Sequence, residues 1–447
     1  MQINNNYFHI CNYYFQICNN VCATQLNSLM NCLLLQKNGT GQMVKAKPRE
    51  QTPLLAAKVA YLKAKGFKQS EIAKRLHLTR PTVSRLLAPE GRAAHYLKVQ
   101  LPTFDWDRVS NEDRRALRDM DEGDSASEKL TALLAAIAPS HVKIEAHVIP
   151  EVADADAPNN SSKPNPFFDS ASRVVWNLLR SAKIIGFTWG RTLSLLLSSA
   201  RRGQYTSPFE GQSEQPIVIP LCGESLATAK PTSLSSSTLA QGFGELLTNL
   251  PEQSCLSLGM IPIFFPGPTA FDDAELRAGR KLLSYSAAYR EIFDGDGANA
   301  TEKDPLAKRL DVVVTSISRV NCPFGFTDSN EFNWKILKLS KLEKLVMGDL
   351  GGVPLAKPNL SAKGQRELRE LLRRWTGLQK DHIRGCVDRA SARGSAAAGV
   401  IVVAIGADRV LTVLEAVRLG LVNRLVLDRP LSESLIEQLD KRSSRAL

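Results

Sequence analysis

The chain has 447 residues, 43% of them hydrophobic, and a formal net charge of +12. At about 150 residues per domain, this length predicts two or three domains, and the hydrophobic fraction is ample for packed cores. No apolar run reaches the roughly 18 residues that a membrane-spanning helix needs, so the sequence argues against an integral membrane protein. We expect a cytoplasmic protein with no membrane partner.

The first 36 residues contain no Lys, Arg, Asp or Glu, and the composition changes abruptly near Met43. We treat residues 1–43 as an atypical N-terminal extension with two open interpretations. Either it is an upstream extension of the reading frame and translation starts at Met43, or it is a native disordered or partner-bound arm. Peptides from residues 1–30 in the native protein would exclude the first interpretation.

Basic residues concentrate in one segment. Residues 44–100 hold eight Lys and five Arg against three Glu. Such an excess attracts DNA through counterion release, whatever the base sequence. A basic surface alone is usually only solvated, so the motif inside this segment decides between the two readings.

That motif is QSEIAKRLHLTRPTVSRLLA, residues 69–88, whose pattern predicts the two crossing helices of a DNA-binding helix-turn-helix. Ala73 is the small residue that lets the helices approach closely. A supporting helix precedes the motif over residues 53–65, and we place the DNA-binding domain at residues 50–102. The expected buried positions are Ile72, Leu76, Leu78, Val83 and Leu86.

The second helix of the motif carries the expected DNA contacts. Thr79 is a good N-cap for it, Pro81 suits its first turn, and Pro89 with Gly91 ends it. A short strand is expected over residues 95–101. Side chains predicted to reach bases and phosphates in the major groove are those of Gln69, Ser70, Arg80, Thr82, Ser84 and Arg85.

The rest of the chain has the pattern of a doubly wound, mostly parallel α/β domain, because its short apolar runs alternate with amphipathic helices. Residues 103–166 are expected to be a linker and the start of this domain, with a helix over 126–137 and a loop over 151–166. Residues 167–440 are expected to complete it. The candidate strands are residues 142–149, 183–187, 216–221, 261–265, 311–317, 399–405 and 423–427.

The segment KIIGFTWGRTLSLLL, residues 183–197, reads as a strand, a glycine-bearing turn and a helix. Gly186 and Gly190 are expected to shape the turn, with Arg191 and Thr192 where the helix begins. Free backbone N–H groups and the helix dipole would converge there on an anion. The alternative is a simple connection, since the segment matches neither a P-loop nor GxGxxG.

A second strand, turn and helix follow one another over residues 400–428, with Gly406 in the turn. Arg409 lies at the start of the helix, where a cation opposes the helix dipole unless it faces an anion. Arg409 is therefore a candidate phosphate ligand. The alternative is an ordinary salt bridge to the neighbouring Asp408.

Together these segments resemble the SorC family of bacterial transcriptional regulators, the sugar-binding-domain regulators related to the deoxyribonucleoside regulator of bacilli. The resemblance spans roughly residues 53–430. The motifs that carry it are SEIAKRLHLTRPTVSRLL, IIGFTWGRTL, PLCGES, LDVVVTSISRV, GDLGGVPL and GLVNRLVLD.

The resemblance implies a DNA-binding domain joined to an effector domain of the sugar-phosphate isomerase type, which binds a phosphorylated sugar without converting it. It also implies a homo-oligomer, usually a tetramer, whose grip on operator DNA changes with the effector. Arg409 falls where the family commonly has a phosphate-binding Lys. The other implied effector-binding residues are Gly186, Trp189, Gly190, Arg191, Thr192, Cys222, Gly223 and Gly406.

Three departures from the family pattern stand out. His77 replaces the usual Gly in the turn of the DNA-binding motif, although His tolerates positive φ better than most residues. Residues 315–318 lack the usual glycines after their strand. The glycine-rich approach to Arg409 is reduced to residues 404–406, so the pocket or its effector is expected to differ.

We therefore expect an effector-controlled regulator of a carbohydrate operon and not an enzyme. A sugar-phosphate isomerase or lactonase-like enzyme fused to a DNA-binding module is the alternative, with Asp349 as its best carboxylate. Recognition of a sugar hydroxyl is the milder role for that residue. A ligand-free structural DNA binder would leave the α/β domain unexplained.

The eight cysteines predict no metal site and no cofactor. The first four lack a paired CxxC and suitably spaced histidines, and the others are scattered, so reduced thiols are expected. The cysteines are Cys11, Cys18, Cys22, Cys32, Cys222, Cys255, Cys322 and Cys386.

Overall fold

The computed structural model describes two parts of the chain, one helical and one α/β. The expected strand over 261–265 and the extension over 1–43 lie outside the described residues, and of the expected strand over 95–101 only Tyr96 is described. No helix among the described residues is long and apolar enough to cross a membrane. Described are residues 53–65, 67–88, 91–93, 96, 124–150, 165–203, 207–210, 212, 214–223, 234–248, 256, 258, 273–294, 304–319, 342–394 and 397–446.

The helical part contains α2 (Pro53–Ala64), α3 (Gln69–Arg75) and α4 (Arg80–Leu87). The predicted cap of α4 is present, since Thr79 Oγ1 accepts the Thr82 N–H at 3.3 Å. At α3 the Glu71 carboxylate accepts the N–H of the residue before the helix at 2.6 Å. The apolar residues predicted to be buried pack into one core. That core includes Ala56, Val59, Leu62, Ile72, Ala73, Val83 and Leu86, with Leu76 and Leu78 partly buried against it.

The α/β part is built on a six-stranded sheet in the order β1-β8-β7-β4-β2-β3, with every neighbouring pair parallel. From β2 the chain continues to β3 on one side, whereas β4 lies on the other side of β2. The carboxyl ends of β2 and β4 therefore form a topological switch point, where doubly wound proteins bind ligands. The strands are β1 (Glu145–Ile149), β2 (Ile184–Phe187), β3 (Ile217–Pro220), β4 (Val312–Ser316), β7 (Gly399–Ala404) and β8 (Arg424–Asp428).

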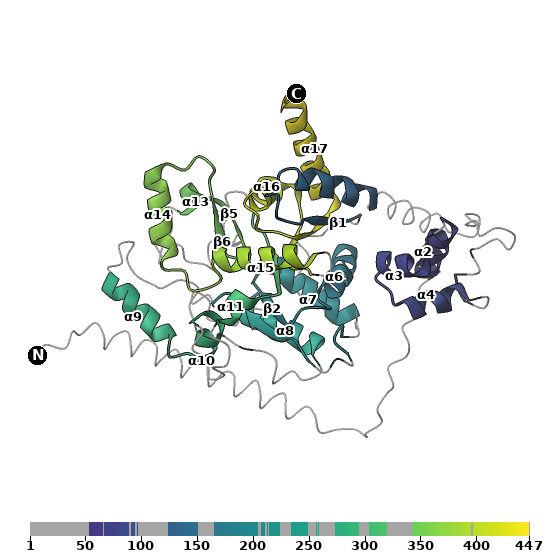
Figure 1. Ribbon diagram of the computed structural model, residues 1–447, viewed down its shortest axis with the longest axis horizontal. Helices are drawn as coiled ribbons and strands as arrows, with labels where there is room; N and C mark the ends of the chain where they lie inside the picture. The colour runs from purple at the N-terminus through teal and green to yellow at the C-terminus, as the bar shows by residue number, and fades with distance from the viewer. Residues whose placement is uncertain are drawn as a thin grey trace, which may run out of the picture. The chain divides into compact units, whose positions relative to one another are not determined.

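Helices cover both faces of this sheet, which explains why its strands are apolar on both sides (Figure 1). In β7, Val400 and Val402 point into one core, while Ile401 and Val403 point into the other. The predicted doubly wound α/β class is confirmed. One face carries α6 (Pro166–Leu178), α7 (Arg191–Gly203) and α8 (Ser236–Leu247), and the other carries the helix over 124–135, α15 (Lys380–Arg393), α16 (Val410–Arg418) and α17 (Arg429–Ala446).

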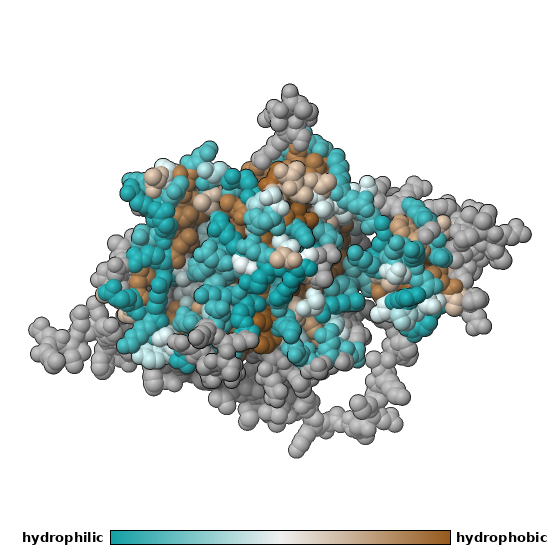
Figure 2. Space-filling model, in the orientation of Figure 1, coloured by the Kyte–Doolittle hydropathy of each residue, from teal (hydrophilic) through white to brown (hydrophobic). Residues whose placement is uncertain are grey.

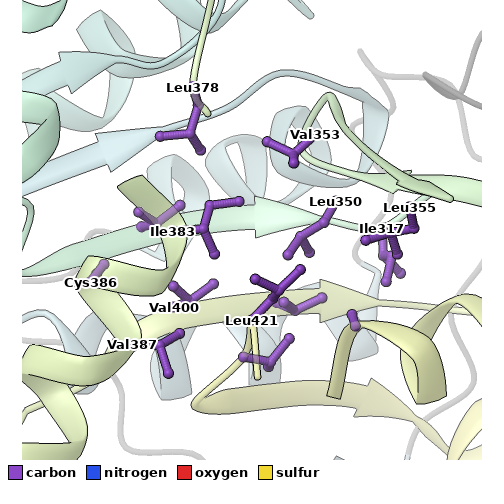
Figure 3. Packing of buried hydrophobic residues seen from close by; sticks show 14 of the residues in the cluster. Ile317, Leu350, Val353, Leu355, Leu378, Ile383, Cys386, Val387, Val400 and Leu421 are labelled. Atoms are coloured by element: carbon purple, nitrogen blue, oxygen red, sulfur yellow. The ribbon is translucent and has the colours of Figure 1, made fainter. Parts of the chain in front are cut away.

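A two-stranded antiparallel hairpin, β5 (Val346–Leu350) and β6 (Val353–Ala356), was not predicted from the sequence. It packs on the core that contains α15, and its Leu350, Val353 and Leu355 lie near Ile317 at the end of β4 (Figure 3). An isolated bridge between Ile317 and Leu350 joins the hairpin to β4. The hairpin therefore lies at the carboxyl edge of the sheet.

Shorter elements complete the described residues. The outward faces of α14 and α15 are mainly hydrophilic (Figure 2), as the amphipathic pattern of such helices requires. The elements are α9 (Asp273–Leu283), α10 (Ala287–Tyr289), the π-helical turn η3 (Arg290–Asp294), α11 (Leu306–Arg309), α13 (Leu342–Leu345), α14 (Ala362–Leu372) and the 3₁₀ turn η6 (Ala407–Arg409).

The amino edge of the sheet is held by polar side chains that are buried or partly buried. Asn423 Oδ1 accepts the Val400 N–H at 3.1 Å, and Asn423 Nδ2 donates to the Lys143 carbonyl and to Ser391 Oγ, both at 3.1 Å. Asp311 Oδ2 accepts two backbone N–H groups at the start of β2, at 3.0 and 3.1 Å. These bonds link strands and helices far apart in the sequence.

Candidate functional site

The helix-turn-helix presents the predicted DNA-contacting face to solvent. Arg80, Ser84 and Arg85 of α4 are exposed, as is Ser70 at the start of α3. The other two predicted residues are partly buried: Gln69, and Thr82, whose hydroxyl lies 2.8 Å from that of the capping threonine. Their contact with DNA stays a prediction.

His77 is the only non-glycine residue with positive φ among the described residues, at 51°. This is the left-handed conformation expected where relatives of the motif carry Gly, and a histidine adopts it at some cost. The turn is closed by the Leu78 N–H, which donates to the Ala73 carbonyl at 2.8 Å. The turn of the motif therefore survives the replacement of its glycine.

The predicted anion-binding turn joins β2 to α7. Gly190 has φ 115°, and its N–H donates to the Leu234 carbonyl at 3.0 Å. The helix begins at Arg191, whose side chain is exposed and forms no ion pair with any described residue. Thr192, in the first turn, is partly buried. The strand, turn and helix predicted for this segment are confirmed.

The prediction that Gly186 shapes this turn is wrong. Gly186 lies inside β2, paired with Ile219 and Val313 of the neighbouring strands. A Cβ there would lie only 2.5 Å from the Leu221 side chain. Its missing side chain therefore makes room for the segment after β3, and Gly190 is the glycine of the turn.

The tip of the β5–β6 hairpin fills the space beside this turn. A Cβ on Gly351 would lie 2.2 Å from Thr315 Oγ1 and 2.6 Å from Thr188 Cγ2, and the Gly351 N–H donates to the Ser316 carbonyl at 3.0 Å. Both glycines of the tip have positive φ, 58° and 91°. Only glycine at the tip allows the hairpin to approach β2 and β4 this closely.

Two aromatic side chains form one wall of the same region. Trp189 and Trp375 are both buried and meet edge to face, with ring centroids 5.7 Å apart. Cys222, after β3, is buried, and its thiol lies 3.4 Å from the Gly351 carbonyl oxygen. The buried Gly223 follows directly. The structure thus brings the Trp189 turn, the segment after β3 and the hairpin tip together.

Asp349, the best carboxylate in the sequence, lies in the hairpin and is buried. Its Oδ1 accepts the Gly352 N–H at 2.8 Å, and its backbone exchanges two hydrogen bonds with Ser318 after β4. These contacts tighten the hairpin turn and hold it to β4. Recognition of a sugar hydroxyl by Asp349 stays a prediction.

Arg409 lies where β4 and β7 end. Its Nε donates to the Ile317 carbonyl at 3.1 Å, and one terminal nitrogen donates to the Ile405 carbonyl. The same nitrogen lies 3.0 Å from Asp408 Oδ1, so the alternative salt bridge is present. Asp408 also pairs with Arg319, at 2.9 Å. Two arginines share one carboxylate, which leaves this group of three side chains with one net positive charge.

The turn before Arg409 depends on a residue that the sequence analysis did not single out. Gly406 has φ 85°, and its N–H points between the two oxygens of Asp428, at 3.0 and 3.1 Å. Asp428 is the last residue of β8 and is buried. An acid at the carboxyl end of a strand was the available signal, but its partner lies 22 residues away in the sequence.

Two further polar residues at this edge were missed. Arg319 stands in the motif LDVVVTSISRV, three residues after β4. Thr412, in the first turn of α16, is buried, and its hydroxyl has no hydrogen-bond partner among the residues that the structure describes. A spacing of three residues from Arg409 puts Thr412 on the same side of the helix, which was the signal available for it.

Most of the predicted effector residues therefore lie along one edge of the sheet. The Gly190 turn, the Arg409 group and the hairpin meet around the end of β4, because Ser316 lies under Gly190 and Ile317 accepts from Arg409. A net positive charge and buried hydroxyls at one edge suit an anionic, polyhydroxylated molecule. No group of three His, Cys, Asp or Glu side chains suited to a metal ion occurs among the described residues.

Comparisons with known proteins give matches among solved structures alone. No protein-family model and no curated protein matches the chain. Among solved structures it is similar to the full-length sorbitol operon regulator SorC from Klebsiella pneumoniae, at 19% identity and a TM-score of 0.46, over 86% of this chain and 99% of that one. A domain of a possible sugar-binding transcriptional regulator from Arthrobacter aurescens TC1 gives 20% identity and a TM-score of 0.44, over 70% and 97% of the two chains.

A third solved structure, the probable sor operon regulator from Shigella flexneri, gives 15% identity and a TM-score of 0.45, over 70% of this chain and 99% of that one. These neighbours are SorC-type and sugar-binding transcriptional regulators. With identities of 20% or less and TM-scores below 0.5, they do not assign a function or a site to this chain.

Proposed function

We propose that this protein is a DNA-binding regulator of a carbohydrate operon and that a phosphorylated sugar bound at the carboxyl edge of the sheet controls it. The observation that carries the proposal is the group formed by Arg409, Asp408 and Arg319. Its net positive charge stands at the ends of parallel strands, in a chain that also contains a helix-turn-helix. In this arrangement residues 50–102 bind DNA, 103–166 link the domains and begin the second, and 167–440 bind the effector.

Phosphate recognition at this group has a simple chemistry. Arg409 now donates to neutral backbone carbonyls and to a half-exposed carboxylate. A dianionic phosphate would offer stronger, charge-assisted acceptors for the same guanidinium. The sugar hydroxyls would face the Gly190 turn, where Arg191 and Thr192 open α7.

The rival function is catalysis on a sugar phosphate. Isomerisation needs a carboxylate or histidine within reach of the substrate to move a proton. Asp349 is the buried carboxylate nearest the hairpin tip, and it is engaged with the Gly352 N–H. This engagement favours a positioning role and a sensor over an enzyme.

Calorimetric titration with a panel of phosphorylated and unphosphorylated sugars tests the function. We expect at least one phosphorylated sugar to bind and its unphosphorylated form to bind at least about tenfold more weakly. Assays with the same compounds should show no turnover above the buffer blank. Turnover that is lost in the Asp349→Asn variant would contradict the sensor and establish the enzyme.

We also propose a homo-oligomer, because two helix-turn-helix modules are needed to read two half-sites of an operator. Light scattering after size-exclusion chromatography measures the mass directly. A tetramer or dimer is expected from a chain of 49.1 kDa, and a monomer in the presence of operator DNA would contradict this arrangement.

A further inference from the structure

The carboxylate of Asp428 connects the turn over residues 406–409 to the start of α17. No other carboxylate among the described residues connects these two elements. Its two oxygens accept the Gly406 N–H, and Oδ1 also accepts the Leu431 N–H at 3.2 Å. Leu431 is the third residue of α17, so Asp428 acts as the N-cap of that helix. One buried carboxylate thus holds both the turn before Arg409 and the first turn of α17.

We propose that Asp428 is the positioning residue of the effector site and that it ties the 406–409 turn to α17. This inference rests on the proposed function. Gly406 and Arg409 are separated by a single 3₁₀ turn, so the direction of the Gly406 peptide sets where the Arg409 side chain begins. The Arg409 N–H in turn donates to the Gly406 carbonyl at 3.3 Å, which makes the turn one hydrogen-bonded unit.

Because Asp428 is negatively charged, its removal distinguishes a positioning role from a purely electrostatic effect on anion binding. A negative charge close to an anion site weakens anion binding by repulsion, so removing it would tighten binding if Asp428 had no other role. If Asp428 holds the turn, removing it frees the Gly406 peptide and weakens binding. The two roles therefore predict opposite signs for the same substitution.

Through α17, the candidate site is connected to the core of the domain and to the helix over 124–135. α17 packs on the core beneath β8 through Leu431, Leu435 and Leu439. Farther along, Asp440 pairs with Lys129 at 2.9 Å on the helix over 124–135, the first described element after the helix-turn-helix segment. An effector that stiffens the 406–409 turn stiffens the start of α17 through the shared carboxylate.

The test compares three variants of the full-length protein. Asp428→Ala removes both acceptors, and Asp428→Asn keeps one oxygen for them while it removes the charge. Asp311→Ala is the matched control, since Asp311 also accepts two backbone N–H groups but at the amino edge of the sheet. The probes are inorganic phosphate and glucose 6-phosphate, titrated by calorimetry after melting curves show that each variant is folded.

We expect Asp428→Ala to weaken probe binding at least about tenfold, and Asp428→Asn to stay within about threefold of the wild type. Asp311→Ala should bind like the wild type although its melting temperature falls. Tighter or unchanged binding in Asp428→Ala overturns the positioning role. If the wild-type protein binds neither these probes nor any phosphorylated sugar, that result contradicts the proposed function itself, and with it the inference that rests on it.

Hydrogen exchange supplies a readout that lost stability alone does not produce. In the wild type, a bound probe should slow exchange of the Gly406 and Leu431 amides together, and in Asp428→Asn it should do so to a lesser degree. Slowing at Gly406 without any change at Leu431 overturns the tie to α17.

Discussion

The two edges of the parallel sheet differ in their side chains and in their backbone conformation. At the amino edge, the buried Asn423 and the partly buried Asp311 form hydrogen bonds to backbone groups. At the carboxyl edge, glycines with positive φ shape the turns and the cationic group around Arg409 is partly exposed. The polar groups of the first edge are satisfied by structural hydrogen bonds, whereas the second edge carries a partly exposed positive charge.

This difference separates stability from binding along one sheet. Substitutions at the amino edge should change the free energy of unfolding and leave ligand affinity alone. Substitutions of the charged side chains at the carboxyl edge should do the reverse, whereas those of its positive-φ glycines should affect both. Parallel sheets divide these roles because every strand ends at the same edge, where the following loops converge.

Asn423→Ala should have the largest effect on stability. The Val400 N–H and the Lys143 carbonyl would lose their partners inside the domain, and the free energy of unfolding should fall by about 3 kcal/mol. Urea denaturation measures this change. Effector affinity, measured on the folded variant, should match the wild type. A large loss of affinity would contradict a purely structural role for the amino edge.

Arg409→Ala should have the largest effect on binding. We expect affinity for a phosphorylated sugar to fall about 30-fold, or about 2 kcal/mol, because a charge-assisted contact is lost. The free energy of unfolding should change by about 1 kcal/mol or less. Arg409→Lys keeps the charge and is the control, with an intermediate affinity in calorimetry. Wild-type affinity in Arg409→Ala would show that the cationic group does not bind the phosphorylated sugar.

Gly190→Ala should affect both properties moderately. A Cβ would have room, 3.5 Å from Ser316 Oγ, but the φ of 115° is strained for alanine, at a cost of about 1.5 kcal/mol. Gly385→Ala, within the helix α15, is the matched control and should be neutral or stabilising. Chemical denaturation and calorimetry on both variants check this, and equal destabilisation of the two would contradict the role given to Gly190.

His77→Gly is a control outside both edges and should have the smallest effect. Glycine adopts the φ of 51° freely, so the free energy of unfolding of the helix-turn-helix should rise by about 0.5 to 1 kcal/mol. His77→Ala keeps the strain and should not be stabilised. Circular dichroism of both variants measures the shift, and a loss of stability in His77→Gly would show that the imidazole makes a contact worth more than the strain.

The helix-turn-helix was predictable because its determinants are local. The cap at Thr79, the acid at Glu71 and the buried positions all act within about 35 residues, where helical periodicity is a reliable guide. The positive φ at His77 was expected because the family that the sequence resembles usually has Gly at this position. No contact with a distant segment is needed to specify this fold.

The carboxyl edge was only partly predictable. Buried strands such as β4 and β7 are evident as apolar runs, but a glycine within a run reads as a turn, and Gly186 was misplaced for that reason. The β5–β6 hairpin was missed because its two strands are short and mainly apolar, with no clear alternation of polar and apolar residues. Asp428 was missed because its role depends on Gly406, a residue in the turn after β7 that only the folded sheet brings near.

The central claim is that a ligand at the carboxyl edge controls DNA binding. The direct measurement is the affinity of the purified protein for the DNA upstream of its own gene, with and without the phosphorylated sugar that it binds. We predict at least about a fivefold change in dissociation constant for the wild type and none for Arg409→Ala. The same affinity at saturating sugar phosphate in the wild type would contradict the account.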